Sequence, residues 1–377
     1  MNKLILIGNG FDLAHGLKTR YDQFLFEYLN NAVNHVEAFD KTFDSKLIQL
    51  SYDSEKTGNQ DDCKSLNELL RMIKNRYTLG FKNRFFSELI DEYNKYGQER
   101  WVDIEYFYFD KIVRVAVQMS KYKSELREHV TVDGGNEVIQ QKALKKISKY
   151  LDDLNTDLKV LKDEFINYLS EYVEPNISIA NQSMQDFLSE RLHEEKNSYS
   201  ESEFFFANFN YTSTVKLYIK SLREQFGNLK IKDSNIHGIL NQNQSNNPVI
   251  FGFGDEFDES YKSIENLNDN RFFENIKSFN YLRSSNYHQL MVFVEKEKFN
   301  VSTIGLSCGL SDRTLLSYIL THENCQNIHV HYHKDEQNYL DIAYEISRHF
   351  IDSKTKFRNK LISFQKSIEC PQLVVDN

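Results

Sequence analysis

The 377-residue sequence contains only three prolines, four cysteines and one tryptophan. The cysteines, Cys63, Cys308, Cys325 and Cys370, are scattered and form no C-x-x-C pair. This pattern excludes a recognisable zinc ribbon and a disulfide framework, so we expect no zinc and a reducing compartment. The sequence also lacks any stretch of about 18 consecutive apolar residues, and we therefore expect no membrane-spanning helix.

An excess of basic residues is also missing. The 46 Lys and Arg residues are outnumbered by 55 Asp and Glu residues, which gives a formal net charge of -9. Because phosphate neutralisation needs clustered Lys and Arg, we expect no generic nucleic-acid-binding surface, although a local basic groove stays open. The apolar run at the N-terminus ends at Asn9 and Asp12 and is too short for a signal peptide, so we expect a cytoplasmic protein.

The first distinctive feature is the apolar run from Leu4 to Ile7, which is followed by Gly8, Gly10 and Gly16. An apolar run without alternation predicts a buried parallel strand, and the glycines allow a sharp turn before a helix. This arrangement is typical of a phosphate or dinucleotide cradle. The spacing departs from G-x-G-x-x-G, however, so a tight turn without a ligand remains the alternative.

Residues from about 20 to 200 are predicted to be almost wholly helical. The segment from Leu69 to Tyr96 has apolar residues at helical spacing. The clearest helix extends from Leu144 to Tyr168, where apolar residues alternate three and four positions apart and stop before Pro175. Such an apolar seam must pack on another helix, either in the same chain or across a dimer.

From about residue 203 the pattern changes to short apolar runs that predict strands. The predicted strands are Phe204 to Phe209, Ile231 to Ile236, Val249 to Phe251, Val301 to Leu306 and Ile328 to Tyr332, and a helix is predicted from Asp312 to Leu320. Together with the first strand, these elements predict an α/β fold: a Rossmann-like parallel sheet with helices on both faces, split by a large helical insert. We expect a sheet domain of residues 1–20 plus 200–350, an insert of residues 21–199, and a C-terminal tail or helix in residues 351–377.

Polar or glycine-rich segments follow four of the predicted strands. They are Asn210 to Thr212, His237 with Gly238, Gly252 to Glu256, and Ser307 to Asp312. Parallel strands end at one edge of a sheet, and ligands bind at that edge in open α/β sheets. These segments are therefore candidates for a common site.

Each candidate segment also has a purely structural interpretation. Asn210 suits the end of a strand next to a helix cap, and His237 followed by glycine suits an ordinary turn. Asp255 with Glu256 suits a solvated acidic turn, and Asp312 suits the first turn of a helix. It is their order along the chain that favours function.

That order carries a resemblance. The sequence opens with GNGFDLAHGL and continues with WVDIE at Trp101 to Glu105, FNYT at Phe209 to Thr212, HG at His237, GFGDE at Gly252 to Glu256 and GLSDRTLL from Gly309. These elements resemble the AbiH family of bacterial phage abortive-infection proteins, from the N-terminus to about residue 335. More remotely, the same layout resembles the sirtuin-like NAD-consuming fold.

The resemblance implies that NAD is the substrate or ligand, and it implies which residues of this chain would contact it. The cradle after the first strand would consist of Gly8, Asn9, Gly10, Phe11, Asp12 and Gly16. Asn210 and His237 would be the catalytic residues, the amide orienting a water near the anomeric carbon and the imidazole accepting a proton. The further nucleotide-binding residues would be Tyr211, Thr212, Asp255, Ser307 and Asp312, with the loop from Ser307 to Asp312 on the adenosine side.

Two positions depart from the sirtuin pattern, because Asp12 stands where sirtuins have serine and Thr212 stands where they usually have aspartate. A carboxylate beside a pyrophosphate is repulsive unless it is paired or faces a ribose hydroxyl. The zinc ribbon is also absent, so we expect hydrolysis of a free nucleotide rather than protein deacylation. The sequence thus predicts an antiphage effector that binds and hydrolyses NAD or a related nucleotide, with the helical insert controlling access.

Two other functions stay open. In the first, the protein is a non-catalytic nucleotide-binding switch, and Asp12 and Thr212 mark lost catalysis. In the second, it is a metal-dependent phosphodiesterase or nuclease that holds magnesium with Asp12, Asp255, Glu256 or Asp312. The expected partners are the nucleotide, a phage-derived trigger and a second copy bound through the helical insert.

A histidine cluster near the C-terminus also needs an interpretation. His329, His331 and His333 alternate along a predicted strand and would therefore share one face, where they could bind a metal. No carboxylate stands at a fixed spacing from them. We therefore favour ordinary packing or hydrogen bonding for these histidines and expect no metal site.

Overall fold

The computed structural model describes residues 1–39, 41–56, 58, 62–96, 103–128, 134–177, 180–196, 202–240, 247–258 and 260–372. The chain forms two compact units. The sheet unit consists of Met1–Thr19, Leu169–Phe251 and Lys277–Asn377, and the helical unit consists of Arg20–Tyr168 and Gly252–Ile276. The segment after Gly252, which the sequence analysis assigned to the sheet domain, therefore belongs to the helical unit.

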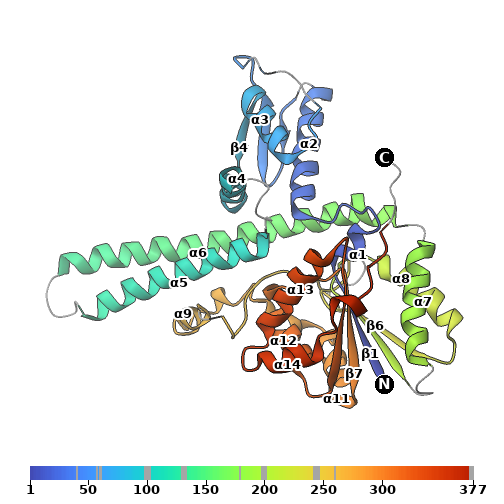
Figure 1. Ribbon diagram of the computed structural model, residues 1–377. Helices are drawn as coiled ribbons and strands as arrows, with labels where there is room; N and C mark the ends of the chain where they lie inside the picture. Colours follow the sequence, from blue (N-terminus) through green and yellow to red (C-terminus); the bar gives the residue numbers. More distant parts are fainter. Residues whose placement is uncertain are drawn as a thin grey trace. The chain divides into compact units, whose positions relative to one another are not determined.

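Five parallel strands form the main sheet (Figure 1), and they are β1 (Asn2–Ile7), β5 (Glu203–Asn208), β6 (Lys230–Asn235), β7 (Phe299–Ile304) and β8 (Cys325–His331). Their order is β6-β5-β1-β7-β8, so the order reverses at β1. Every residue of β1, β5 and β7 is buried, which explains why these segments lack polar alternation. The predicted α/β fold with a parallel sheet is confirmed.

One predicted strand is wrong. Val249 to Phe251 pairs with no strand among the described residues and lies in an extended loop, where the Ile250 N–H donates to the His237 carbonyl at 2.9 Å. Pro248 has no N–H to contribute to a sheet ladder, and Gly252 at a φ of +151° ends the run. The run is apolar because it is buried against the core, and not because it joins the sheet.

Two apolar clusters cover the two faces of the sheet. Ile5, Ile7, Phe204 and Phe206 pack with helices α1 (Asn9–Leu13), α7 (Gln182–Lys196) and α8 (Thr214–Gln225). The alternate residues Leu4, Leu6, Phe205 and Ala207 pack with helices α11 (Asn286–Lys296), α12 (Arg313–Thr321) and α13 (Glu336–His349). Figure 1 shows α7 and α8 on one side of the strands and α12 and α13 on the other.

Short elements complete the sheet unit. They are the π-helical turn η3 (Leu169–Val173), the 3-10 turns η4 (Glu174–Asn176), η6 (Tyr281–Arg283), η7 (Leu310–Asp312) and η8 (Phe364–Lys366), and helices α10 (Lys277–Asn280) and α14 (Lys354–Lys360). The C-terminal segment lies along the edge strand β8, because the Ile362 N–H donates to the Ile328 carbonyl at 3.0 Å. Residues 373–377 of the predicted tail lie outside the described residues.

The helical unit contains a sheet that the sequence analysis missed. Strands β2 (Phe43–Asp44), β3 (Ile48–Tyr52) and β4 (Tyr77–Phe81) are antiparallel. The prediction of an almost wholly helical stretch is therefore wrong, and the expected helix from Leu69 to Tyr96 is two helices, α3 (Leu66–Arg76) and α4 (Arg84–Tyr96), on either side of β4. Thr78 and Gly80 favour the break, because both have low helix propensity.

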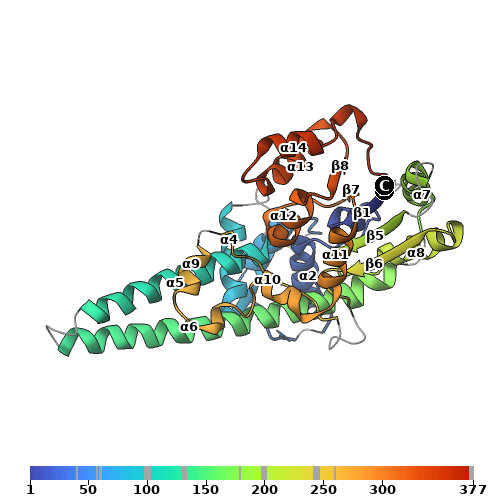
Figure 2. The same ribbon diagram turned by 90° about the horizontal axis from the view of Figure 1, so that it is seen from below.

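The predicted apolar seam lies in α6 (Gly134–Tyr168), which packs on α5 (Ile104–Glu128) of the same chain. Figures 1 and 2 show the two long helices side by side. Leu151, Leu154, Leu158, Leu161 and Phe165 are all buried. The unit is completed by helices α2 (Tyr21–Phe39) and α9 (Tyr261–Glu265) and by the turn η5 (Asn270–Phe272). Of the WVDIE segment, Trp101 and Val102 lie outside the described residues. No helix in the described part of the chain is long and apolar enough to cross a membrane.

Glycines bring the turns after β1 and β7 into close contact. A Cβ on Gly8 would lie 2.6 Å from the Leu306 Cα, and one on Gly10 would lie 2.8 Å from the Gly305 Cα. Gly305 has a φ of +62°, and a Cβ there would lie 2.1 Å from the Phe11 nitrogen. The Gly10 N–H donates to the Gly305 carbonyl at 2.7 Å. The two turns thus form a glycine contact that fixes the start of α1.

We predict that Gly305→Ala destabilises the protein by about 2–5 kcal/mol, because the side chain meets both a positive φ and a backbone clash. Gly309→Ala is the matched control in the same loop, since Gly309 has a φ of -67° and its Cβ would come no closer than 3.6 Å to Ser307 Oγ. The control should change stability by less than about 0.5 kcal/mol. Urea unfolding followed by circular dichroism measures both, and equal midpoints for the two variants would refute the glycine contact.

Candidate functional site

The predicted cradle after β1 is largely occupied by contacts within the protein. The N–H groups of Gly8, Gly10 and Phe11 donate to the carbonyls of Ile304, Gly305 and Gly8. The Asn9 side chain accepts a hydrogen bond from Thr19 Oγ1 at 2.5 Å. Gly16 has a φ of +71° in the turn that follows α1, which explains this glycine without a ligand. The turn is therefore built mainly for packing.

Phe11 belongs to the same packing. Its ring is buried and contacts His15 and Tyr218 of α8. His15 is held between the Phe11 carbonyl, 2.6 Å from Nδ1, and the Tyr218 hydroxyl. Burial lowers the pKa of His15, so its imidazole is a neutral part of the core.

Asp12 is a buried carboxylate with one free oxygen. Thr212 Oγ1 donates to Asp12 Oδ2 at 2.6 Å, whereas Oδ1 has no hydrogen-bond partner among the described residues. Burial raises the pKa of Asp12 to about 6, although the neighbouring Thr212, Thr214 and Asn210 side chains lower it. The nearby Glu174 carboxylate raises it further. Asp12 therefore changes its charge close to neutral pH.

Asn210 belongs to a series of amide contacts at the same strand ends. Its Nδ2 donates to the Gly8 carbonyl at 3.0 Å, and its backbone N–H donates to Asn208 Oδ1 at 3.0 Å. Asn208 in turn donates from Nδ2 to Asn235 Oδ1 at 3.0 Å. These contacts link the ends of β6, β5 and β1 and fix the Asn210 amide beside Asp12.

His237 follows β6 and lies against the segment that contains Asn210. Phe209 contacts the imidazole edge to face with ring centroids 5.3 Å apart, and Tyr211 lies 6.0 Å from it. Tyr281 stacks on the imidazole with an interplanar angle of 21°. The predicted catalytic pair, Asn210 and His237, therefore lies at one end of the sheet, and each side chain belongs to a residue that is only 6% exposed.

Three donors converge on Oδ1 of Asp312. The distances are 2.8 Å from His237 Nε2, 2.7 Å from the Tyr281 hydroxyl and 3.0 Å from Lys277 Nζ. Burial alone would raise the pKa of Asp312, but the Lys277 ammonium and His237 hold it well below the usual range of a carboxyl. Asp312 is therefore ionised at neutral pH. This contact between Asp312 and His237 was not predicted from the sequence.

Two further predicted residues, Tyr211 and Ser307, lie in the loops after β5 and β7. Tyr211 donates its hydroxyl hydrogen bond to the Ile250 carbonyl at 3.0 Å, and Ser307 is exposed in the loop after β7. Asp255 and Glu256 belong to the helical unit, whereas Asp12 and Asp312 belong to the sheet unit. Among the described residues, no group of three His, Cys, Asp or Glu side chains is arranged to hold a metal ion.

His331, the middle residue of the histidine series, is part of the core packing. His331 is buried, its Nδ1 lies 3.2 Å from the Ile368 carbonyl, and its ring contacts Phe187 of α7 edge to face. Burial lowers the pKa of His331 to about 3, so the ring is neutral. His333 lies beyond the end of the strand and is exposed.

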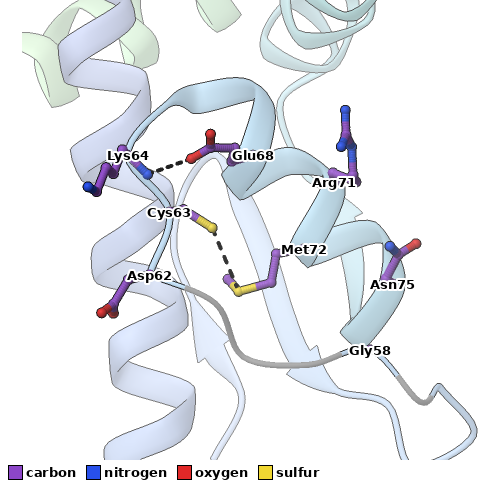
Figure 3. Close-up of a pocket in the computed structure, with 8 residues that line it drawn as sticks. All are labelled: Gly58, Asp62, Cys63, Lys64, Glu68, Arg71, Met72 and Asn75. Carbon is purple, nitrogen blue, oxygen red and sulfur yellow. Dashed lines mark hydrogen bonds between the residues drawn. The ribbon is translucent and has the colours of Figure 1, made fainter.

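A cavity of about 320 Å³ lies in the helical unit (Figure 3). Its lining includes Lys64, whose N–H donates to Glu68 Oε2 at 2.7 Å, and Cys63, whose Sγ lies 4.0 Å from Met72 Sδ. Figure 3 shows the Arg71 side chain extending from α3. None of the predicted site residues lines this cavity.

Three residues that complete the arrangement at the strand ends were not among the predicted site residues. Gly305 lay inside an apolar run and was assigned to a strand, although an isolated glycine in a strand pattern signals close backbone approach. Lys277 and Tyr281 lie in the aromatic segment IKSFNYL. A lysine between Ile276 and Phe279 is a weak signal of a buried cation, and no spacing rule connects it with Asp312.

We predict that Asp12 makes the protein less stable as the pH rises. The pKa of Asp12 is about 6 in the folded protein and 3.8 in the reference state, so the unfolded chain loses this proton first. Stability is therefore lost between about pH 4 and pH 6. The free energy of unfolding of the wild type, relative to Asp12→Asn, should fall by about 1 kcal/mol between pH 5 and pH 7.5. Urea titrations of both proteins measure this difference, and a pH-independent difference would contradict it.

Comparison with known proteins supports the resemblance seen in the sequence. The family model described as bacteriophage abortive infection AbiH matches residues 4–334. This range contains most of β1, the other four strands of the main sheet and the whole of the helical unit. A search of curated proteins finds no match. The chain therefore belongs to the AbiH family of bacteriophage abortive infection proteins.

Proposed function

We propose that this member of the family acts in abortive infection by binding NAD or a related nucleotide at the carboxyl end of its parallel sheet and hydrolysing the nicotinamide glycosidic bond. The observation that supports this most is the convergence of Asn210, Asp12 and the paired His237 and Asp312 at one sheet edge. The strand order reverses at β1, and ligands of open α/β sheets bind next to such a reversal.

In this proposal the side chains, more than the turn amides, recognise the nucleotide. The N–H groups of Gly8, Gly10 and Phe11 are already used within the protein. Asp12 Oδ1 is a buried acceptor without a partner in the described part of the chain, and it suits a ribose hydroxyl. An unsatisfied buried acceptor is costly, so a ligand that donates to it gains affinity.

The two departures from the sirtuin pattern form one interaction. The resemblance led us to expect a hydroxyl at position 12 and a carboxylate at position 212, and the sequence has the reverse. Thr212 Oγ1 donates to Asp12 Oδ2 at 2.6 Å, so the carboxylate and the hydroxyl have exchanged places but remain paired. This exchange supports a site that keeps the same polar groups near a nucleotide ribose.

The catalytic roles follow from the neighbours of each group. Bond cleavage leaves an oxocarbenium-like centre, and the Asn210 amide would orient a water toward it. His237 would take the proton from that water or from a ribose hydroxyl as a general base. The tight hold of Asp312 on Nε2 fixes the plane of the imidazole, which such proton transfer requires.

A second candidate is a non-catalytic nucleotide-binding switch. It is favoured by the burial of Asn210 and His237, which are both 6% exposed and both hydrogen-bonded within the protein. In this case a nucleotide binds and remains intact. The metal-dependent phosphodiesterase gains no such support, because the Lys277 ammonium pairs with Asp312 at 3.0 Å.

The test is NAD consumption by the purified full-length protein, with and without extract from phage-infected cells. We expect Asn210→Ala and His237→Ala to lower the rate at least about 100-fold, as loss of a general base usually does. Asn327→Ala and His333→Ala are matched controls. The Asn327 side-chain amide donates a hydrogen bond to Asn300 Oδ1, with a length of 3.1 Å, near the amino ends of β8 and β7 and so away from the candidate site. His333 is exposed. Both controls should retain activity.

The outcome separates the candidates. If both site variants consume NAD at the wild-type rate, the catalytic assignment is refuted. If the wild type consumes none in either condition, calorimetry with NAD decides between the two main candidates. Binding of a nucleotide that is recovered intact would establish the switch, and activity that appears only with added Mg²⁺ would favour the phosphodiesterase.

A further inference from the structure

The antiparallel sheet of the helical unit has one open edge. β3 lies between β2 and β4, and among the described residues no strand pairs with the other side of β4. Edge strands usually prevent further pairing with a proline, a bulge or a charged side chain. The sequence of β4, YTLGF, contains neither proline nor a charged residue, and its register with β3 is unbroken from Tyr77 to Phe81. The outer side of β4 is therefore suited to pair with another strand.

Hydrogen bonds at the two ends of β4 show which of its residues face outward. The Lys82 N–H donates to the Leu47 carbonyl at 2.9 Å, and the Arg76 carbonyl accepts from the Asp53 N–H at 3.2 Å. Both residues that flank β4 thus direct backbone groups toward β3. Successive residues of a strand direct these groups to alternate sides. The odd-numbered residues of β4 therefore face outward.

These outward residues are Tyr77, Leu79 and Phe81. The Tyr77 N–H donates to the Ile73 carbonyl, and the Tyr77 carbonyl accepts from Lys56 Nζ. In the part of the chain that the structure describes, the outward N–H and C=O groups of Leu79 and Phe81 have no hydrogen-bond partner. Two donors and two acceptors are thus available to a partner strand.

A groove of about 700 Å³ lies on one face of β4, between residues of α3 and α4. From β4 its lining includes Tyr77, Leu79 and Phe81, which share a face because they alternate along the strand. The intervening Thr78 and Gly80 are exposed and do not line it. Figure 1 shows α3, β4 and α4 next to one another. The groove therefore lies on the face to which every second side chain of an added strand would point.

The walls of the groove are apolar. Leu70 and Ile73 of α3 and Ile90 of α4 line it together with Leu79 and Phe81. Phe81 is 36% exposed, so its ring leaves apolar surface uncovered. A strand paired with β4 would cover this surface if every second side chain were apolar, and its other side chains would point to the exposed face.

The charged residues of the groove are mainly basic. Lys56, Arg71 and Lys74 line it, and Asp91 is the acidic residue of the lining. Lys56 is paired with Asp53 at 3.5 Å. Arg71 and Lys74 are exposed on one side of α3, because they are three positions apart, and neither forms an ion pair with another described residue. The groove is thus locally positive in a chain with a net charge of -9.

This charge decides between two occupants. A second copy of the chain would bring the same cations to the same edge, and like charges across an interface are unfavourable. An acidic segment would instead meet the exposed Arg71 and Lys74 with opposite charge. Charge complementarity therefore favours an acidic partner over self-association.

We propose that the outer edge of β4 and its groove bind an extended acidic segment of a partner protein by strand addition. Leu79 and Phe81 would supply the backbone hydrogen bonds, apolar side chains would enter the groove, and acidic side chains would meet Arg71 and Lys74. A segment of about five residues matches the length of β4. The proposal does not rest on the proposed function, because these residues belong to the helical unit, whereas Asn210 and His237 belong to the sheet unit.

The first test measures binding of a fluorescently labelled peptide to the full-length protein by anisotropy. The probe is a peptide of about seven residues that alternates valine and glutamate, so that it spans β4 in either register. We expect saturable binding that weakens as salt is added. The same peptide with lysine in place of glutamate should not bind. No binding of the acidic peptide, or equal binding of the two peptides, would overturn the proposal.

The second test locates the bound peptide. The double variant with Arg71→Glu and Lys74→Glu should bind the acidic peptide at least about 10-fold more weakly. The matched control combines Lys41→Glu and Lys46→Glu, which are exposed in the same unit, do not line the groove and change the net charge equally. The control should stay within about 2-fold of the wild type. Equal losses in the two double variants would exclude the groove as the binding site.

The third test asks whether the peptide pairs as a strand. A strand uses the N–H groups of alternate residues on each of its sides. Of two peptides, one N-methylated at its valines and one at its glutamates, one should bind at least about 10-fold more weakly and the other should bind almost normally. Equal effects of the two methylations would refute strand addition, whatever the variants of the protein show.

The variant Leu79→Pro separates a partner segment from a second copy. It removes an outward N–H and leaves the hydrogen bonds between β4 and β3 intact. We expect it to weaken peptide binding at least about 10-fold and to leave the sedimentation coefficient of the protein unchanged. A wild-type dimer that this substitution dissociates would assign the edge to a second copy and overturn the proposal.

Discussion

The close contact between the turns after β1 and β7 is the constraint on which the candidate site depends. Gly8 and Gly10 meet Gly305 and Leu306 at distances that leave no room for a Cβ. This contact sets where α1 starts, and α1 carries Asp12 to Thr212. The loop after Gly305 then carries Asp312 to His237. One backbone contact thus places both buried carboxylates at the same sheet edge.

Asp12 and Asp312 show how the surrounding groups set the pKa of a buried carboxyl. Asp12 is surrounded by hydroxyls, an amide and the Glu174 carboxylate, and burial raises its pKa to about 6. Asp312 is equally buried, but an ammonium and an imidazole contact it and hold its pKa well below the usual range. Groups whose environments push their pKa values apart in this way are typical of acid–base chemistry. The sheet edge therefore provides one carboxyl that titrates and one that stays ionised.

The sequence correctly predicted the strands that are apolar on both faces. Its predictions were wrong for segments whose structure depends on contacts with distant parts of the chain. The runs at Leu4 to Ile7 and at Val301 to Leu306 have the unbroken apolar pattern that is typical of a buried parallel strand. Val249 to Phe251 is also apolar but only fills a space in the core, and the flanking Pro248 and Gly252 are the local signals against a strand. The antiparallel sheet with Ile48 and Leu50 was missed because its strands are short and lie between strong helix patterns.

The site was predicted in its residue types more than in its contacts. Asn210, His237 and Asp312 were named because they follow strands, and parallel strands bring such residues together. The pairing of Asp12 with Thr212, and of Lys277 with Asp312, joins residues far apart in the chain. A single sequence gives no information on which distant residues pair with each other. Only the packed structure shows that Asp12 and Thr212, which both differ from the sirtuin pattern, hydrogen-bond to each other.

The central position of β1 in the sheet affects how the protein folds during its synthesis. The first strand pairs with Phe204 on one side and with Phe299 on the other, so both of its neighbours lie far along the chain. At a ribosomal rate of about 5–20 residues per second, roughly 15–60 seconds pass between the synthesis of β1 and that of β7, its second neighbour in the sheet. The site exists only after that, because Gly305 and Asp312 come later still. A truncated or stalled product that ends before β7 therefore lacks the glycine contact and the pairing of Asp312 with His237.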